Sequence, residues 1–229
     1  MLSVLKPIFS NLFSLLFPKL CLGCQEALLL PKNCLCYQCE IALPPTYFHL
    51  IQENPMGDRM SIVPRLKHLF SLYYFEPTGI MESMLYALKY QENKTVGVFF
   101  GRKLAAAMAV SAVHFDGIIG VPLHPKRKRK RGYNQVDIIG ETAAKALTIP
   151  YYNSALSRTK NTPPLSKTKR ARAVVLANAF AIKENLPAGR HFLLLDDIFT
   201  TGATLNACAK ILLEEANISL SIATVAYRN

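Results

Sequence analysis

Two neighbouring carboxylates and a threonine–glycine turn stand together in the segment FLLLDDIFTTGATLNACAKILLEEA. The apolar residues before Asp196 and Asp197 predict a strand that is buried on both faces. Such a strand brings the residues after it to the carboxyl edge of a parallel sheet, where ligands bind in open α/β folds. There the two carboxylates can accept hydrogen bonds from the vicinal hydroxyls of a ribose or bind a sugar phosphate through Mg²⁺. We therefore take Asp196 and Asp197 as the candidate catalytic residues.

The turn after the acidic pair has the composition of an anion-binding loop that leads into a helix. Its glycine lets the backbone approach an anion, and the N–H groups at a helix N-terminus favour a phosphate dianion. A solvated strand end followed by a helix cap is the alternative interpretation, but it does not require these residue types at these offsets. The predicted phosphate-binding residues are Thr200, Thr201, Gly202, Ala203 and Thr204.

Six consecutive cations, Lys126 to Arg131, follow another predicted strand at residues 116–123. We expect this strand to lie beside the one that carries the acidic pair, with the cations in its trailing loop. Such a run either stays solvated or meets phosphate, and its place at a strand end favours pyrophosphate or nucleic acid. Asn134 and Gln135 should begin the next helix and add donors to the anion site. The residues assigned to the pyrophosphate side are Lys126, Arg127, Arg129 and Arg131.

Two Cys-x-x-Cys pairs near the N-terminus predict a metal site. Each pair forms a tight turn that presents two thiolates, and two pairs complete a tetrahedral shell. A shell of thiolates without an open position indicates structural Zn²⁺, which stabilises a segment too short to have its own core. A redox dithiol is the alternative. Cys34 competes with Cys36 as a ligand, but Cys36 gives the better turn, so the predicted ligands are Cys21, Cys24, Cys36 and Cys39.

The composition indicates a globular protein with anionic partners. Of 229 residues, 51% are hydrophobic, which allows a sizeable core, and the formal net charge of +12 favours nucleic acid, nucleotides or phosphorylated sugars. Residues 1–20 are apolar but lack the basic start and cleavage site of a signal peptide. We expect them to form an amphipathic helix that docks on the protein, with attachment to a membrane surface as the alternative. No membrane span is expected, and the predicted location is cytoplasmic.

Strand-type and helix-type patterns alternate along the chain, which predicts an α/β fold with a parallel sheet flanked by helices. Residues 158–180 are rich in cations and should form a mobile loop or hairpin. Lys89 should be an ordinary helix-surface lysine, with contact to a phosphate as the alternative. The expected strands cover residues 69–75, 116–123, 151–157, 191–195 and 219–227, and the expected helices cover residues 80–90, 96–113, 133–147 and 204–216.

The acidic pair and the turn after it resemble, position for position, the signature of type I phosphoribosyltransferases. The resemblance implies a type I phosphoribosyltransferase fold. It places Asp196 and Asp197 on the 2′ and 3′ hydroxyls of phosphoribosyl pyrophosphate, which binds with Mg²⁺, and Thr200 to Thr204 on its 5-phosphate. The chain then divides into an N-terminal helix and zinc knot (1–45), a connector with a hood strand (46–80) and the phosphoribosyltransferase domain (81–229).

A narrower resemblance covers residues 21–227. The chain resembles the competence protein F (ComF/GntX) group of phosphoribosyltransferase-like proteins in three features. These are the stretch VPLHPKRKRKRGYNQ, the cysteine pairs and a helix that ends in Leu-Lys-Tyr. The chain departs from that group at Pro164 and Val175, where Gln and Asn are usual, within the basic loop.

These resemblances imply three functions. The first is transfer of ribose 5-phosphate from phosphoribosyl pyrophosphate to an acceptor, as in a pentosyl-type glycosyltransferase, with a family link to natural competence and DNA uptake. The second is a non-catalytic protein of transformation that binds or processes single-stranded DNA with a helicase-type ATPase. In that case, Lys126 to Arg131 and Lys167 to Arg172 would form an electrostatic track. The third is a regulator that senses phosphoribosyl pyrophosphate.

Overall fold

The structure is a computed structural model that describes residues 18–60, 65–111, 113–158 and 179–229. Most of the helix expected over residues 1–20 and of the basic loop expected over residues 158–180, including Lys167 to Arg172, lies outside the described residues.

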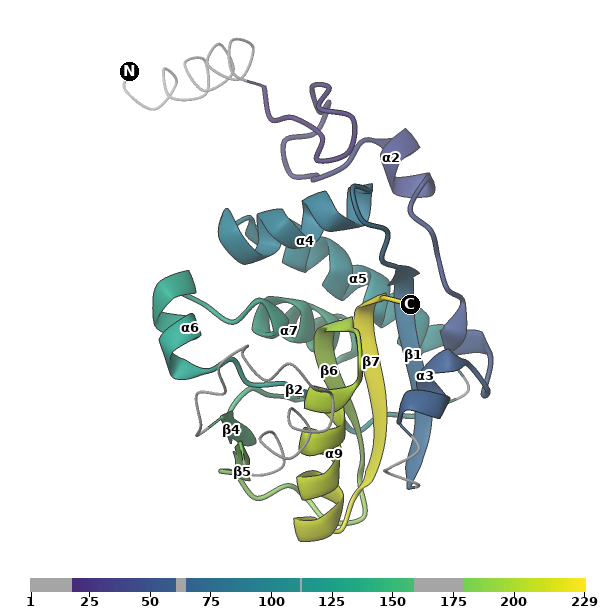
Figure 1. Cartoon of the computed structure of the whole chain (residues 1–229), viewed down its shortest axis with the longest axis vertical. Coiled ribbons are helices and arrows are strands. Elements are labelled where there is room, and N and C mark those ends of the chain that lie inside the picture. Colours follow the sequence, from purple (N-terminus) through teal and green to yellow (C-terminus); the bar gives the residue numbers. More distant parts are fainter. Residues whose placement is uncertain (1–17, 61–64, 112, 159–178) are drawn as a thin grey trace.

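A five-stranded parallel sheet forms the centre of the fold, as the alternating pattern predicts. Because the strands are parallel, their carboxyl ends meet at one edge, which carries the C-terminus of the chain in Figure 1. The central strand contains four consecutive leucine or phenylalanine side chains that are fully buried. The strands, in spatial order, are β1 (Leu66–Tyr74), β7 (Ser219–Tyr227), β6 (His191–Phe199), β2 (Gly117–Gly120) and β3 (Tyr151–Tyr152).

Helices cover both faces of the sheet (Figure 1). On one face, α5 (Lys94–Val110) packs closely on α7 (Gln135–Leu147), and α9 (Ala203–Glu215) covers the other. The close approach of α5 and α7 requires glycine at position 101, because a Cβ there would lie 2.5 Å from Cβ of Thr142. Above the carboxyl edge of the sheet lie α4 (Ile80–Tyr90) and α6 (Pro125–Arg131).

Short elements complete the described chain. They are α2 (Tyr37–Ile41), the 3₁₀ turn η1 (Phe48–Leu50), α3 (Pro55–Arg59) and the antiparallel pair β4 (Leu156–Arg158) and β5 (Phe180–Ile182). The strand predicted over residues 151–157 is therefore wrong, because β3 joins the main sheet and β4 joins a separate one. The connector, expected to be irregular, contains α3, which begins at an Asn54 cap followed by a proline.

The basic run is a helix and not the loop that the sequence predicts. His124 precedes α6 and accepts a hydrogen bond from the Lys126 backbone N–H, at 3.2 Å, through its ring nitrogen Nδ1. Pro125 occupies the first turn, and Gly132 ends the helix in the left-handed conformation at φ 79°. A helix cap, a proline and a terminal glycine thus outweigh the repulsion between neighbouring cations.

The cysteine-rich segment lies beyond α4, on the side away from the sheet (Figure 1). Two polar contacts join it to α5: Lys19 Nζ donates to Thr95 Oγ1 at 3.2 Å, and Lys103 Nζ lies 2.7 Å from Glu40 Oε1. Among the residues that the structure describes, no helix combines the length and the apolar character needed to cross a bilayer.

Candidate functional site

A cavity of about 290 Å³ opens at the carboxyl edge of the sheet, where β2 ends before β6 does. The last β2 residue, Gly120, pairs with Leu195, so β6 continues past it with only β7 beside it. Because β2 is shorter than β6, residues from α4, α6 and α7 occupy the space beside Asp196 and Asp197. The cavity is lined by Lys89, Tyr90, Val121, Pro122, Leu123, Arg127, Arg131, Asn134, Gln135, Val136, Arg158, Asp196, Asp197, Ile198, Thr200 and Thr204.

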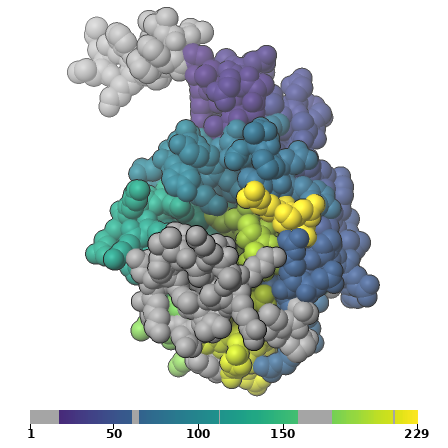
Figure 2. All heavy atoms as spheres, viewed as in Figure 1, coloured from purple at the N-terminus to yellow at the C-terminus, as the bar shows by residue number. Residues whose placement is uncertain are grey.

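Figure 2 shows the same region from outside, where the green residues around the end of β6 form the floor between α4 in blue and α6 in teal. The space-filling view therefore agrees with a site that is built from the sheet edge below and from two helices above.

Asp197 is buried and held by cationic and amide groups. Lys89 Nζ lies 2.9 Å from Asp197 Oδ2, and Gln135 Nε2 donates to the same oxygen at 2.7 Å. The Gln135 Oε1 atom in turn accepts a hydrogen bond from Arg131. A connected network therefore runs from α6 through α7 and β6 to α4, and it compensates the buried charge of Asp197.

The prediction that Lys89 is an ordinary helix-surface lysine is wrong. Its side chain is 19% exposed and forms the ion pair with Asp197. The end of α4 is held over the sheet edge because the Tyr133 hydroxyl donates to the Leu88 carbonyl. The sequence places Lys89 on a helix but does not tell which part of the protein that helix end faces.

Asp196 has an unusual protonation equilibrium. Burial raises its pKa to about 7, and the neighbouring carboxylate of Asp197 acts in the same direction. The Asp197 backbone N–H donates to Asp196 Oδ1 at 2.8 Å, and Lys89 and Arg158 lie near enough to oppose the rise. Asp196 therefore changes its charge near neutral pH, unlike an exposed aspartate.

The turn after β6 has the backbone expected of an anion loop. Gly202 adopts φ 71° and precedes α9, whose N–H at Asn206 bonds back to the Gly202 carbonyl at 2.8 Å. Of the five predicted residues, Thr200 and Thr204 line the cavity, whereas Thr201, Gly202 and Ala203 form the turn between them. The structure thus brings the loop and the acidic pair together.

The helical form of the basic run divides the cations between two sides. Arg127 and Arg131 are four residues apart and both line the cavity. Lys126 and Arg129 are not among the described residues that line it, so only half of the predicted pyrophosphate-side residues come together there. An adjoining hollow of about 450 Å³ shares Lys89, Tyr90, Arg127 and Arg131 with the cavity and adds Glu92 and Lys130.

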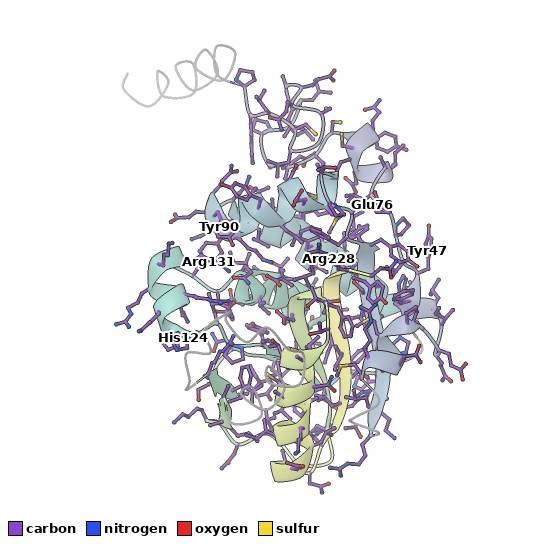
Figure 3. All side chains as sticks on the ribbon, in the orientation of Figure 1. Tyr47, Glu76, Tyr90, His124, Arg131 and Arg228 are labelled. Atoms are coloured by element: carbon purple, nitrogen blue, oxygen red, sulfur yellow. The ribbon has the colours of Figure 1, made fainter. Side chains whose placement is uncertain are left out.

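Two further residues line the site. Tyr90 belongs to the Leu-Lys-Tyr helix end named in the resemblance, whereas Arg158 carries no sequence signal that we recognised. Tyr90 is largely exposed at the end of α4, with the Arg131 guanidinium 5.3 Å from its ring centroid, and the two side chains lie next to each other in Figure 3. Arg158, at the end of β4, also lines the cavity, and burial together with the nearby Arg127 lowers its pKa. Both reach the site from segments distant in the sequence.

The four predicted cysteine ligands cluster, and Cys34 does not join them. Their sulfur atoms all lie within 4.8 Å of one another, with Cys24 Sγ 3.8 Å from Cys36 Sγ. A tetrahedral Zn²⁺ with Zn–S bonds of about 2.3 Å requires sulfur separations of about 3.8 Å, so the geometry fits such an ion. Cys34 is buried nearby, and that burial raises its pKa to about 11.

Cys21 lies in a setting that favours its thiolate. Burial acts to raise the pKa of Cys21, but backbone N–H groups around its sulfur outweigh that effect and lower the pKa to about 6. The N–H groups of Gly23 and Cys36 donate to Cys21 Sγ at 3.4 and 3.2 Å. A segment that stabilises a thiolate without a nearby cation suits a soft metal ion.

The raised pKa of Asp196 predicts a pH dependence of stability. The folded-state pKa of about 7 exceeds the usual 3.8, so the stability that this group contributes is fully present at low pH and is lost as pH rises through 7. Asp196→Asn cannot ionise and should therefore unfold at higher urea concentration than the wild type at pH 8, with a smaller difference at pH 5.

Asp58→Asn is the matched control for this measurement. Asp58 is an exposed aspartate of α3, so its substitution should change stability little and by the same amount at pH 5 and pH 8. A stability difference for Asp196→Asn that does not change between these two pH values would contradict the raised pKa.

Comparison with known proteins gives relatives for most of the chain, although no family model matches it. Competence protein F of Haemophilus influenzae is 28% identical over 216 residues, an alignment that covers 84% of this chain and 90% of that protein. DNA utilization protein YhgH of Shigella flexneri is 29% identical over 210 residues, covering 89% and 88%. Competence protein ComFC of Bacillus subtilis is 32% identical over 98 residues, covering 43% and 38%.

Solved structures similar to this one include adenine phosphoribosyltransferases. The enzyme from Saccharomyces cerevisiae has a TM-score of 0.38 and 21% identity, and the match covers 58% of this chain and 68% of that one. The enzyme from Thermoanaerobacter pseudethanolicus has a TM-score of 0.40 and 15% identity, covering 64% and 73%.

The sequence relatives confirm the resemblance to competence protein F that the motifs indicate, because the alignments span most of both proteins. The chain is therefore a homologue, over most of its length, of competence protein F and the YhgH proteins.

Proposed function

We propose that the cavity at the end of β6 binds phosphoribosyl pyrophosphate or a closely related sugar phosphate. The observation that carries this proposal is the set of groups that line the cavity: the carboxylates of Asp196 and Asp197, the threonines of the loop, and the arginines of α6. Ribose hydroxyls need acceptors, and phosphoryl groups need cations and hydrogen-bond donors. The cavity offers both kinds of group at one sheet edge.

In the proposed complex, each part of the site meets one part of the ligand. The carboxylates accept hydrogen bonds from the ribose hydroxyls, with Asp197 kept in place by Lys89 and Gln135. The turn that begins at Thr200 and the start of α9 receive the 5-phosphate. Arg127 and Arg131 neutralise the diphosphate.

The oxygen donors of the acidic pair also suit Mg²⁺, because that ion prefers carboxylate and phosphate oxygens. Bound with the ligand, Mg²⁺ would supply further positive charge at the diphosphate. If the bound ligand transfers its ribose 5-phosphate to an acceptor, as the motif resemblance implies, the arginines of α6 stabilise the pyrophosphate that leaves.

The acidic pair provides the direct test. Asp196→Asn and Asp197→Asn together should weaken binding of phosphoribosyl pyrophosphate, measured by calorimetry with Mg²⁺, by at least about tenfold, because two charged acceptors are lost. Glu214→Gln, which neutralises an exposed carboxylate at the far end of α9, is the matched control and should bind like the wild type. Equal affinity of the double variant and the wild type would refute the proposal, and pyrophosphate release in the same mixture would report turnover.

A second candidate function, binding of single-stranded nucleic acid, has its own support on the outer side of the cavity. Tyr86 and Tyr90 are 55% and 65% exposed, and their ring centroids lie 5.2 Å apart on one face of α4. The adjoining hollow adds Lys130 and Arg131. Exposed aromatic rings beside cations suit bases and phosphates of a single strand, and the names of the relatives, competence and DNA utilization proteins, support a role with DNA. A helicase-type ATPase partner stays a prediction from the resemblance.

The tyrosine pair makes this second function testable. Tyr86→Ala with Tyr90→Ala should weaken binding of a short oligothymidylate, followed by fluorescence anisotropy over a salt series, by about 1–3 kcal/mol for each base that stacks. The salt dependence should change little, since no phosphate contact is lost. Tyr37→Ala, which removes an exposed tyrosine from α2, is the control. A double variant that binds as tightly as the wild type would exclude stacking on α4.

We further propose that the four clustered cysteines hold a structural Zn²⁺. Purified protein should contain roughly one zinc per chain, as the tetrahedral cluster of thiols requires. Cys24→Ser should lose the metal and unfold more readily, because metal binding stabilises so short a segment. Cys34→Ser, which changes a neighbouring cysteine outside the cluster, should keep its zinc in elemental analysis. Metal-free, fully stable wild-type protein would disprove the assignment.

A further inference from the structure

The turn after β6 is braced from outside the cavity by a segment that precedes it by about 140 residues in the chain. This segment, residues 54–60, contains α3 and is called here the α3 brace. It lies beside β1 at the edge of the sheet (Figure 1). None of the sequence patterns described above assigns it a role in the site.

Arg59 is the central contact of the α3 brace. Its Nη1 atom donates to the Thr200 carbonyl at 2.8 Å and to the Arg228 carbonyl at 3.0 Å. Its guanidinium also lies 5.3 Å from the ring centroid of Tyr227, which stacks on Phe199. One side chain thus joins α3, the start of the turn and the end of β7.

Two more contacts hold the turn against the same segment. Asn206, in the first turns of α9, donates from Nδ2 to the Arg59 carbonyl at 3.1 Å. Met60 is 2% exposed and packs on Gly202, where an added Cβ would lie 3.0 Å from its sulfur. The turn is therefore contacted at its beginning, at its glycine and at the helix that follows.

The α3 brace is itself fixed to the sheet. Asn54 caps α3 by accepting from the Met56 N–H at 3.1 Å, and its Nδ2 donates to the Leu69 carbonyl of β1 at 2.7 Å. The Met56 side chain is fully buried. Arg59 therefore extends from a rigid base and not from a free loop.

The Thr200 contact fixes more than one atom, because a peptide unit is planar and trans. In the peptide unit that joins Thr200 to Thr201, the C=O of Thr200 and the N–H of Thr201 point in opposite directions. When Arg59 holds the Thr200 carbonyl on the outer side, the Thr201 N–H must point away from Arg59. Anion-binding turns depend on such N–H groups converging on one point.

We propose that Arg59 is a positioning residue of the phosphate-binding turn: by holding the Thr200 carbonyl, it keeps the backbone N–H groups of the turn directed at the 5-phosphate of the ligand. This inference rests on the proposed function. It adds that part of the phosphate site is built by a segment that precedes β1 in the chain.

Ribose 5-phosphate is the probe that isolates this end of the site. Arg59→Ala should weaken its binding, measured by calorimetry, by about tenfold, because ligand binding must then order a turn that Arg59 no longer holds in place. Arg59→Lys keeps a donor and should recover part of the affinity. Arg65→Ala is the matched control, because Arg65 donates to the Leu213 carbonyl far along α9 from the turn. It should bind like the wild type.

Amide hydrogen exchange supplies a readout that does not depend on the ligand. In Arg59→Ala, exchange at residues 200–204 should become faster, while the second half of α9 keeps the wild-type rate. If Arg59→Ala fails to fold, the smaller change Arg59→Lys carries the same two measurements with smaller expected effects.

The outcomes separate the inference from the function on which it rests. Unchanged binding of ribose 5-phosphate by Arg59→Ala, or an equal loss in Arg65→Ala, overturns the role of Arg59 while the proposed function stands. Failure of the wild type to bind ribose 5-phosphate and phosphoribosyl pyrophosphate overturns the proposed function. If Arg59→Ala leaves amide exchange at residues 200–204 unchanged, the α3 brace does not hold the turn, whether or not the proposed function is correct.

Discussion

Two adjacent carboxylates near the end of a buried strand repel each other and are costly to desolvate. The surrounding elements supply the groups that offset this free-energy cost. Lys89 and Gln135 compensate Asp197 directly, and Asp196 carries the remaining strain as a pKa raised to about 7. Lys89 and Gln135 lie on α4 and α7. The hydroxyl of Tyr133, just before α7, donates a hydrogen bond to the Leu88 carbonyl of α4 and so holds the two helices together. A short β2 leaves room for them beside β6.

The same arrangement explains why the site is cationic around an acidic centre. Arg127, Arg131 and Arg158 surround the two aspartates at the cavity wall. The proposed ligand, with hydroxyls in its middle and phosphates at its ends, matches this order of charge. Tyr86 and Tyr90 of α4 are exposed to solvent, and Tyr90 lies beside Arg127 and Arg131 in the adjoining hollow. The site is therefore open to solvent at that end.

The acidic pair, the turn after it and the cysteine cluster could be predicted from the sequence, because the patterns that indicate them are local. The apolar run before Asp196, the glycine after Thr201 and the spacing of Cys36 from Cys39 each depend on neighbours within a few residues. The structure brings the turn and the cysteines together as expected, but β6 continues to Phe199 and so contains the acidic pair, which the sequence predicts after the strand. The adjacency of β2 and β6 also follows from the order of strands and helices.

The remaining features could not be predicted because they depend on contacts between distant segments. Lys89 and Arg59 reach the site from helices whose facing is set only by packing in three dimensions. The helix α6 is a different case. Its cap at His124 and its terminal Gly132 are local signals of a helix, but six consecutive like charges after a strand favour a loop.

That helix, about two turns long, divides its cations between two sides. Arg127 and Arg131 line the cavity, whereas Lys126, Lys128 and Arg129 are exposed and are not among the described residues that line it. In the two proposed complexes, a ligand in the cavity and a nucleic-acid strand in the adjoining hollow would both contact Arg131, so each would weaken the binding of the other. Thermodynamic linkage requires the two effects on binding free energy to be equal in size.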